Sequence, residues 1–316
     1  MKYATKCVRH SRAIWLDNAF DVEEGFVYTR YNNPNRYELE AQMLDLYSRK
    51  AAYCYCLSNA MACLNLVLSV NQKQIIADKY VHEESRRLLN KHNAKYADLG
   101  RDCNFSVDAL VGVDVLSNPE CKPYDIASIL SKAKEAGCKV LVDNTMLTSY
   151  YSNPFDYGAD FVIESLSKYA GGHGDSLGGA LLCNTRMDDE VALYGYGLQP
   201  LNAYLIRRGI ATLPLRLEKI KSNTDIVLAY LKKRVDIKGS DARSGMIDFT
   251  FGTCLQHKQF VESLQVIDNS FSFGQDNTLA AVVNSNDSIR LCIGLEEASD
   301  IIDDIKRALM PFGRGS

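Results

Sequence analysis

The residues with the clearest chemical potential are a lysine and an acid, each placed at the end of an apolar run. Lys168 lies in the segment 164–169, directly after the apolar run 161–163, and Asp143 closes another apolar run, 140–142. An amine and an acid in this arrangement suit pyridoxal 5′-phosphate (PLP). That cofactor needs a lysine to hold its aldehyde as a Schiff base and an acid to keep its ring nitrogen protonated. The spacing therefore predicts a PLP site with Lys168 and Asp143 at its centre.

Two further features suit the phosphate group of such a cofactor. Ser165 and Ser167 offer hydroxyl groups at alternate positions beside the lysine. Upstream, the small polar turn 58–61 joins a predicted strand, 53–57, to a predicted helix. A strand followed by a small-residue turn and a helix N-terminus is a ready anion-binding site. We therefore expect the phosphate to bind between this turn and the two serines.

The overall composition narrows the class of protein. The chain has 316 residues, 47% hydrophobic and 24% charged, which is typical of a soluble globular protein of about two domains. Its net charge of −3 argues against nucleic acid as the main partner. No apolar run approaches the roughly 20 residues that span a bilayer, and the start has no apolar signal core, so a cytoplasmic protein is expected. The 10 cysteines include no CxxC pair, so we expect buried structural thiols and no metal site.

Apolar periodicity predicts strands alternating with helices over the first two-thirds of the chain. Strands are expected at 53–57, 74–77, 109–113, 140–143, 159–164 and 179–183, and helices at 37–50, 64–68, 83–90 and 125–136. This alternation predicts an α/β fold with a mostly parallel sheet covered on both faces. Ligands of such sheets bind at the carboxyl ends of the strands, where Asp143 and Lys168 both fall.

The character of the sequence changes at about Leu213. A long helix is expected through 217–231, strands at 246–251 and 288–293, and a closing helix at 300–309. The polar segment 236–245 is predicted to be a loop. These elements predict a smaller C-terminal α+β domain over 213–312, after a cofactor-binding domain over 37–212 and an N-terminal arm over 1–36.

The order of several motifs resembles the cystathionine γ-synthase/γ-lyase family of PLP-dependent enzymes, which act in cysteine and methionine metabolism. The resemblance runs from about Tyr28 to Glu297 and keeps the order of its motifs throughout, which makes it specific. The motifs are Tyr28-Thr29-Arg30 to Arg36, Ser117-Asn118-Pro119, Asp143-Asn144-Thr145, Gly158-Ala159-Asp160, Ser165-Leu166-Ser167-Lys168-Tyr169, Gly172-His173-Gly174-Asp175, Tyr204 to Gly209, and Ser288 to Glu296. The resemblance implies a fold-type I PLP-dependent transferase-like architecture.

The resemblance also implies roles for individual residues toward the cofactor. Lys168 would hold PLP and later move protons as a free amine, and Asp143 would pair with the ring nitrogen. The phosphate would be bound by a set made of two hydroxyls and two backbone N–H groups: Ser165, Ser167, Ala60 and Met61. Tyr80 would stack on the ring near the substrate amine, and Asn118 would approach the ring hydroxyl.

Other matched positions concern the substrate and a second subunit. Arg290 would bind the substrate α-carboxylate, since its planar guanidinium suits a bidentate pair, and Ser272 would lie beside the substrate. A solvent-facing Arg290 on its strand is the alternative. Tyr28 and Arg30 resemble the pair that reaches the phosphate from a neighbouring subunit. The resemblance thus implies a homo-oligomer, a dimer or a dimer of dimers, with shared active sites.

The chain departs from the family pattern at three places that bear on the substrate. Ala60 stands where the family has a glycine in the phosphate turn. The segment 81–85 after Tyr80, glycine-rich in the family, is Val-His-Glu-Glu-Ser here, and Phe271 replaces an acid. The region between the long helix and Met246 is also short. These departures leave the substrate open while the cofactor residues are intact.

The resemblance therefore predicts a PLP-dependent lyase or transferase. Its expected reaction is γ-replacement or γ-elimination on a homoserine ester or a sulfur amino acid, as in transsulfuration. The alternatives are β-elimination that releases pyruvate, a specialised secondary-metabolite enzyme on the same scaffold, and a PLP-binding regulator without activity. A complete set of Lys168, Asp143 and Arg290 disfavours the regulator.

Overall fold

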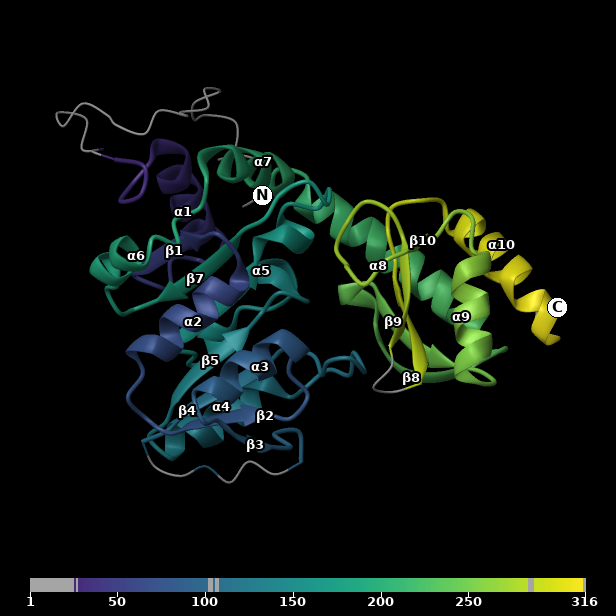
Figure 1. Cartoon of the computed structure of the whole chain (residues 1–316), viewed down its shortest axis with the longest axis horizontal. Helices are drawn as coiled ribbons and strands as arrows, with labels where there is room; N and C mark the ends of the chain where they lie inside the picture. The colour runs from purple at the N-terminus through teal and green to yellow at the C-terminus, as the bar shows by residue number, and fades with distance from the viewer. Residues whose placement is uncertain (1–25, 27, 102–104, 106–107, 284–286, 315–316) are drawn as a thin grey trace. The chain divides into compact units, whose positions relative to one another are not determined.

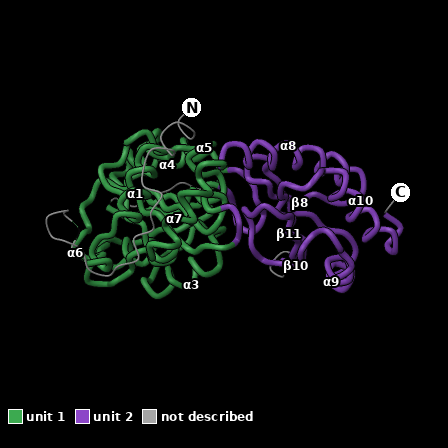
Figure 2. The backbone as a smooth tube through the Cα atoms, turned by 90° about the horizontal axis from the view of Figure 1, so that it is seen from above, with its two compact units in different colours: residues 1–115, 124–171, 175–212 green, residues 116–123, 172–174, 213–316 purple. Residues whose placement is uncertain are grey.

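The structure is a computed structural model that describes residues 26, 28–101, 105, 108–283 and 287–314. Its contacts divide the chain into two compact units (Figures 1 and 2). The first comprises residues 1–115, 124–171 and 175–212, and the second comprises 116–123, 172–174 and 213–316. The second unit thus takes in two short segments from the middle of the sequence. The contiguous domain bounds expected from the sequence stay a prediction.

A seven-stranded sheet forms the centre of the first unit. Its order is β1 (Tyr53–Leu57), β7 (Gly179–Cys183), β6 (Phe161–Ser165), β5 (Lys139–Asp143), β4 (Leu110–Asp114), β2 (Ile75–Asp78) and β3 (Lys95–Ala97). Strand β7 runs antiparallel to both neighbours, and the pairs from β6 to β3 are parallel. Every residue of β4 and β7 is buried, as apolar strands covered on both faces require. The predicted α/β fold with a mostly parallel sheet is confirmed.

The helices of the first unit are α1 (Pro34–Leu46), α2 (Ala60–Val70), α3 (Glu83–Lys91), α4 (Ile126–Glu135), α5 (Thr148–Tyr151), α6 (Asp188–Tyr194) and α7 (Pro200–Ile210), with a 3₁₀ turn at Pro154–Tyr157. Three of these helices, α1, α2 and α4, begin at a capping side chain. Asn33, Asn59 and Asp125 each accept a backbone N–H from the first turn of the helix that follows. Gly137, with a φ of 74°, follows the end of α4, where a left-handed residue closes the helix.

A five-stranded sheet forms the second unit, in the order β10 (Asp268–Asn269), β11 (Leu279–Val283), β12 (Ser288–Cys292), β9 (Met246–Thr250) and β8 (Asp236–Asp241). Its helices are α8 (Leu213–Leu231), α9 (Cys254–Ser263) and α10 (Ala298–Leu309), with 3₁₀ turns at Ala242–Ser244 and Met310–Phe312. Phe249, Phe260 and Leu291 are among the buried residues of its core. The smaller C-terminal α+β unit expected from the sequence is confirmed.

One predicted element of the second unit is wrong. The segment 236–245 was expected to be a loop, but its first part is strand β8, which pairs with β9 from Asp236↔Thr250 to Asp241↔Met246. Strand β8 is an edge strand, which pairs with β9 alone, so polar side chains can face solvent along it. A register shift between Ile237 and Gly239 further obscures the period-2 pattern.

Within the described residues, no helix combines the length and the apolar character needed to cross a membrane.

Candidate active site

The two residues at the centre of the prediction lie at the carboxyl ends of two neighbouring strands in the first sheet. Asp143 is the last residue of β5, and Lys168 follows β6 within a few residues. Strands β5 and β6 are parallel neighbours, with Asp143 opposite Ile163. Because the carboxyl ends of parallel strands meet at the same edge, this edge receives both the acid and the lysine.

Short hydrogen bonds join the segments that carry Asp143 and Lys168. The N–H of Ser165 donates to Oγ1 of Thr145 at 2.8 Å, and the N–H of Thr145 donates to Oδ1 of Asp143 at 2.9 Å. The N–H of Asn144 donates to the carbonyl of Ile163 at 2.8 Å. The end of β5 and the end of β6 are therefore fixed to one another by the two residues that follow the acid.

Lys168 lies inside a π-helical turn, Leu166–Ala170, with a non-helical backbone at the lysine itself (φ −97°, ψ −129°). The N–H of Gly171 closes the turn on the carbonyl of Leu166 at 2.9 Å. Helix α7 packs directly behind it, since a Cβ at Gly209 would lie 2.0 Å from the carbonyl oxygen of Gly171. Single π-turns of this kind are frequent at functional sites, because they aim one side chain away from the regular helical path.

The expected phosphate residues also gather at this edge. The hydroxyl of Ser167 accepts the N–H of Gly178 at 2.9 Å and donates to its carbonyl at 3.2 Å. The next residue, Gly179, begins β7 and lies so close to α2 that a Cβ there would be 2.5 Å from the backbone nitrogen of Ala60. The serine after β6 and the first turn of α2 are thus brought together through two glycines.

The first turn of α2 has the character of an anion site. The cap residue Asn59 satisfies the N–H of Ala62 at 2.8 Å. Among the residues that the structure describes, the N–H groups of Ala60 and Met61 donate to no protein acceptor. Two orphan donors at the positive end of an 11-residue helix suit a phosphate group, so the residues present fit this part of PLP.

A second acid, Asp114, stands beside Asp143 and was not predicted. It ends β4 and is opposite Asp143 in the parallel register, and both line a cavity of about 40 Å³ next to Ala60 and Met61. Burial raises the pKa of Asp143, while its Thr145 hydrogen bonds oppose this. Burial and the charge of Asp143 together raise the pKa of Asp114 well above its usual range. The Thr145 hydrogen bonds favour the charged form of Asp143, and a charged Asp143 suits a protonated ring nitrogen.

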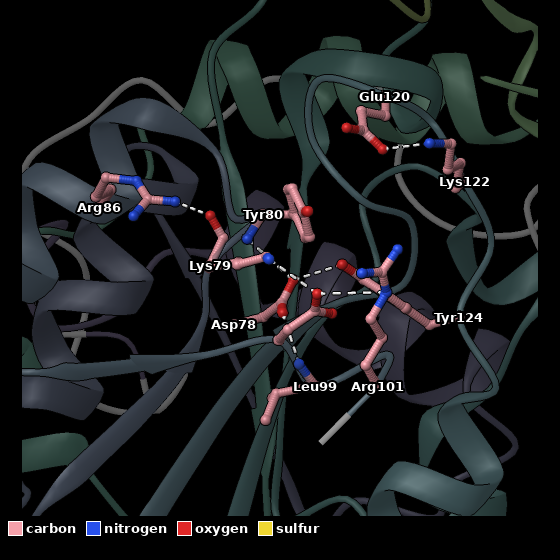
Figure 3. A network of polar contacts seen from close by, with 10 residues as sticks. Asp78, Lys79, Tyr80, Arg86, Leu99, Arg101, Glu120, Lys122 and Tyr124 are labelled. Atoms are coloured by element: carbon pink, nitrogen blue, oxygen red, sulfur yellow. Dashed lines mark hydrogen bonds and ion pairs between the residues drawn. The ribbon is translucent and has the colours of Figure 1, made fainter. Parts of the chain in front are cut away.

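Tyr80 follows the end of β2 and is half-buried. Its N–H donates to Oδ2 of Asp78 at 3.1 Å, and the ammonium of Lys79 lies 4.7 Å from the centroid of its ring (Figure 3). Strand β2 is the parallel neighbour of β4 in the same sheet, so Tyr80 leaves the sheet at the edge where Asp114 and Asp143 end.

Three predicted residues belong to the second unit. Arg290 on β12 is buried, and its Nη2 donates to the carbonyl of Phe271 at 2.9 Å, which places it beside the segment that carries Ser272. Asn118 lies in a turn closed by the N–H of Ser117 on the carbonyl of Lys122 at 2.9 Å. Strand β12 is an inner strand and Arg290 is only 8% exposed, so this arginine is not a solvent-facing side chain.

The structure does not bring Tyr28 and Arg30 to Lys168. Instead Nη1 of Arg30 donates to the carbonyl of Ala192 at 2.9 Å, and its guanidinium lies 4.5 Å from the centroid of the Tyr31 ring. Tyr28 is exposed. A role for this pair in the active site of a second subunit stays a prediction.

A buried acid outside the predicted set, Glu164, lies within β6. The hydroxyl of Tyr47 donates to Oε2 of Glu164 at 2.6 Å and accepts from Nδ2 of Asn144 at 2.9 Å. Burial raises the pKa of Glu164 to about 7, against the opposing effect of the Tyr47 hydrogen bond. This network braces the residue that follows Asp143, so its state is linked to the geometry of the site.

We expect Glu164→Gln to stabilise the protein more at pH 8 than at pH 5. The folded protein keeps the Glu164 proton up to about pH 7, whereas the unfolded chain releases it near 4.5. The wild type therefore loses stability as pH rises through this window, at ~1.4 kcal/mol per pH unit, and glutamine does not. The difference in unfolding free energy between variant and wild type should grow by about 2–3 kcal/mol. Urea unfolding at the two pH values measures it, and a difference independent of pH would contradict the assignment.

The chain is similar to known proteins of one enzyme family. The sequence model of the Cys/Met metabolism PLP-dependent enzymes matches residues 4–286. Cystathionine beta-lyase of Neurospora crassa is 29% identical over 90% of this chain and 74% of its own length. Cystathionine gamma-lyase of Bacillus subtilis is 27% identical over 90% and 89%. The solved structure of cystathionine gamma synthase from Xanthomonas oryzae pv. oryzae, in complex with cystathionine, is 25% identical, covers 96% and 94% of the two chains and has a TM-score of 0.86.

Proposed function

The chain belongs to the Cys/Met metabolism family of PLP-dependent enzymes, and from that premise we propose that it catalyses γ-replacement or γ-elimination on a homoserine ester or a sulfur amino acid. PLP is its cofactor, and its reaction class is that of a lyase or transferase. The observation that best supports this site is a pair of hydrogen bonds, one from Ser165 to Thr145 and one from Thr145 to Asp143. They hold the lysine-bearing turn and the acid as one rigid edge.

PLP, when bound, supplies a place for the electron pair left on the substrate α-carbon. The residues of the chain do the remaining work. Asp143 keeps a proton on the ring nitrogen, and Ser165, Ser167 and the N–H groups of Ala60 and Met61 bind the phosphate. Lys168 moves a proton at the substrate α-carbon and, for γ-chemistry, at the β-carbon. Arg290 and Ser272 orient the α-carboxylate, and Tyr80 covers the ring near the substrate amine.

The substrate-specific part of the proposal rests on the relatives and on Phe271. Relatives named as γ-lyases, γ-synthases and β-lyases match at similar identity. Phe271 is exposed, and its carbonyl accepts from Arg290. An apolar side chain at this place favours a substrate without a second charged group near the carboxylate. We therefore place O-acylated homoserine and methionine-like substrates ahead of cystathionine.

The products distinguish γ- from β-chemistry. The purified holoprotein is mixed with O-acetylhomoserine with and without cysteine, and separately with cystathionine and cysteine. γ-Elimination yields 2-oxobutyrate and γ-replacement yields cystathionine, whereas β-elimination yields pyruvate. 2-Oxobutyrate or cystathionine from the homoserine ester supports the proposal. Pyruvate as the keto acid from every active substrate establishes the alternative, a β-eliminating lyase.

We also propose that the active unit is a homo-oligomer in which Tyr28 and Arg30 serve the phosphate site of a neighbouring copy. Inactive Arg30→Ala and Lys168→Ala proteins are unfolded together and refolded as a mixture. Random pairing gives mixed dimers with one intact site of two in about half of the molecules, hence about a quarter of wild-type activity. Each variant refolded alone should stay inactive. No recovery in the mixture would mean that Arg30 acts within its own chain.

A further inference from the structure

The turn that carries Tyr80 is anchored by a buried acid. Asp78 is fully buried and accepts three hydrogen bonds: from the N–H of Tyr80 at 3.1 Å, the N–H of Leu99 at 3.1 Å and the hydroxyl of Tyr124 at 2.7 Å (Figure 3). Three donors on one carboxylate satisfy it well in a dry environment. The backbone at Tyr80 is therefore held in place, but its ring can still turn about its own side-chain bonds.

A cation lies over that ring. The ammonium of Lys79 is 4.7 Å from the centroid of the Tyr80 ring, which is within the range of an attractive cation–π contact. Asp98 holds the same ammonium through an ion pair of 2.8 Å. Hydrogen bonding to Asp98, and then to the Tyr80 side chain, raises the pKa of Lys79. The cation is thus shared between a carboxylate and an aromatic ring.

The backbone of Lys79 is held in place by hydrogen bonds on both of its polar groups. The N–H of Lys79 donates to the carbonyl of Ala97 at 2.9 Å, and Nη2 of Arg86 donates to the carbonyl of Lys79. The guanidinium of Arg86 in turn lies 4.7 Å from the ring centroid of Tyr96 on β3. Both backbone polar groups of Lys79 are therefore bound, so the side chain starts from a defined position beside Tyr80.

The Lys79–Asp98 pair is poorly placed to stabilise the fold. The Lys79 side chain is 42% exposed, and ion pairs in such positions contribute little to the free energy of unfolding. Its specific geometry lies instead in its contact with Tyr80. Asp98 has a second cation, Arg101, at 3.8 Å, but that side chain is 87% exposed, and among the contacts that the structure describes none joins it to the Tyr80 ring.

We propose that Lys79, held by Asp98, is a positioning residue that fixes the ring of Tyr80 for stacking on the cofactor. The inference rests on the proposed cofactor role of Tyr80. A ring clamped on one side by a cation presents its remaining surface in one orientation, and less rotational freedom is lost when a planar partner binds. Lys79 then acts through Tyr80 and needs no contact of its own with cofactor or substrate.

The test compares cofactor binding by four apoproteins: wild type, Lys79→Met, Lys79→Arg and Arg101→Met. Methionine keeps an unbranched four-atom chain like the stem of lysine and removes the ammonium, and arginine keeps the charge. Arg101→Met removes the other cation near Asp98. PLP affinity is measured by equilibrium dialysis, and the asymmetry of the bound ring by circular dichroism in the cofactor absorption band. Thermal unfolding of each apoprotein shows whether the fold is affected.

We expect Lys79→Met to weaken PLP binding by about two- to fivefold, the range of an exposed cation–π contact, and to reduce the dichroism of the cofactor band. Lys79→Arg should restore both, and Arg101→Met should match the wild type, with closely similar melting temperatures throughout. Equal affinity and dichroism in Lys79→Met and wild type would overturn the inference, as would an equal loss in Arg101→Met. Failure of wild-type apoprotein to bind PLP would instead overturn the proposed function.

Discussion

Replacing Lys168 with alanine is expected to lower turnover by at least about a thousandfold while the protein still binds PLP without a covalent bond. The lysine is both the attachment point and the base for the α-proton, and general-base groups alone contribute about 10²–10⁴-fold. The phosphate site is left intact, because Ser167 and the α2 N-terminus keep their contacts with Gly178 and Gly179. Single-turnover kinetics and the absorption spectrum of the bound cofactor measure the two effects.

Two controls sharpen this prediction. Lys132→Met, which removes an exposed lysine of α4, should keep the activity, since that lysine makes none of the site contacts described above. Addition of a small primary amine to Lys168→Ala should restore part of the turnover, because it can replace the missing base. Near wild-type activity in Lys168→Ala would contradict the assignment of this residue.

Asp143→Asn is expected to reduce turnover by about 10²–10³-fold, comparable to removal of one strong electrostatic contact in other active sites. The amide keeps the shape and can still accept the Thr145 N–H, but it carries no charge to hold a proton on the ring nitrogen. It also removes the charge that helps to raise the pKa of Asp114. Steady-state kinetics with the best substrate, at saturating PLP, measure the loss.

The matched variant is Asp114→Asn, which alters the neighbouring acid in the same cavity. Burial and the charge of Asp143 raise the pKa of Asp114 well above its usual range, so an uncharged amide resembles its neutral form, and the loss should be below about tenfold. A larger loss in Asp114→Asn than in Asp143→Asn would contradict this assignment and would make Asp114 the acid that pairs with the ring nitrogen.

The central strands and the acid–lysine edge were accessible from the sequence because burial leaves a strong pattern. Strands β5 and β6 are apolar runs, and each ends in a change to polar residues that marks the active edge. Strand β4 gave the same signal, but it was expected to end at Val113, one residue short, so Asp114 was missed. The same criterion that found Asp143, an acid that closes an apolar run, would have found it.

Other features depend on tertiary contacts that leave no local pattern. Strand β8 lies at the edge of its sheet and carries one large apolar side chain, Ile237, so it resembled a loop. The contact between Lys79 and Tyr80 depends on Asp98, which is fixed near it only by the pairing of β2 with β3. The π-turn at Lys168 packs closely against α7 at Gly171, and these two segments are far apart in the chain.

The most direct test of the account is chemical capture of the cofactor on its lysine. The wild-type protein is loaded with PLP, reduced with borohydride, digested and analysed by mass spectrometry. We predict one stoichiometric pyridoxyl modification, on the peptide that contains Lys168, and its loss in Lys168→Ala. A stoichiometric modification on another lysine, or none on a protein that is fully loaded with PLP, would contradict the account.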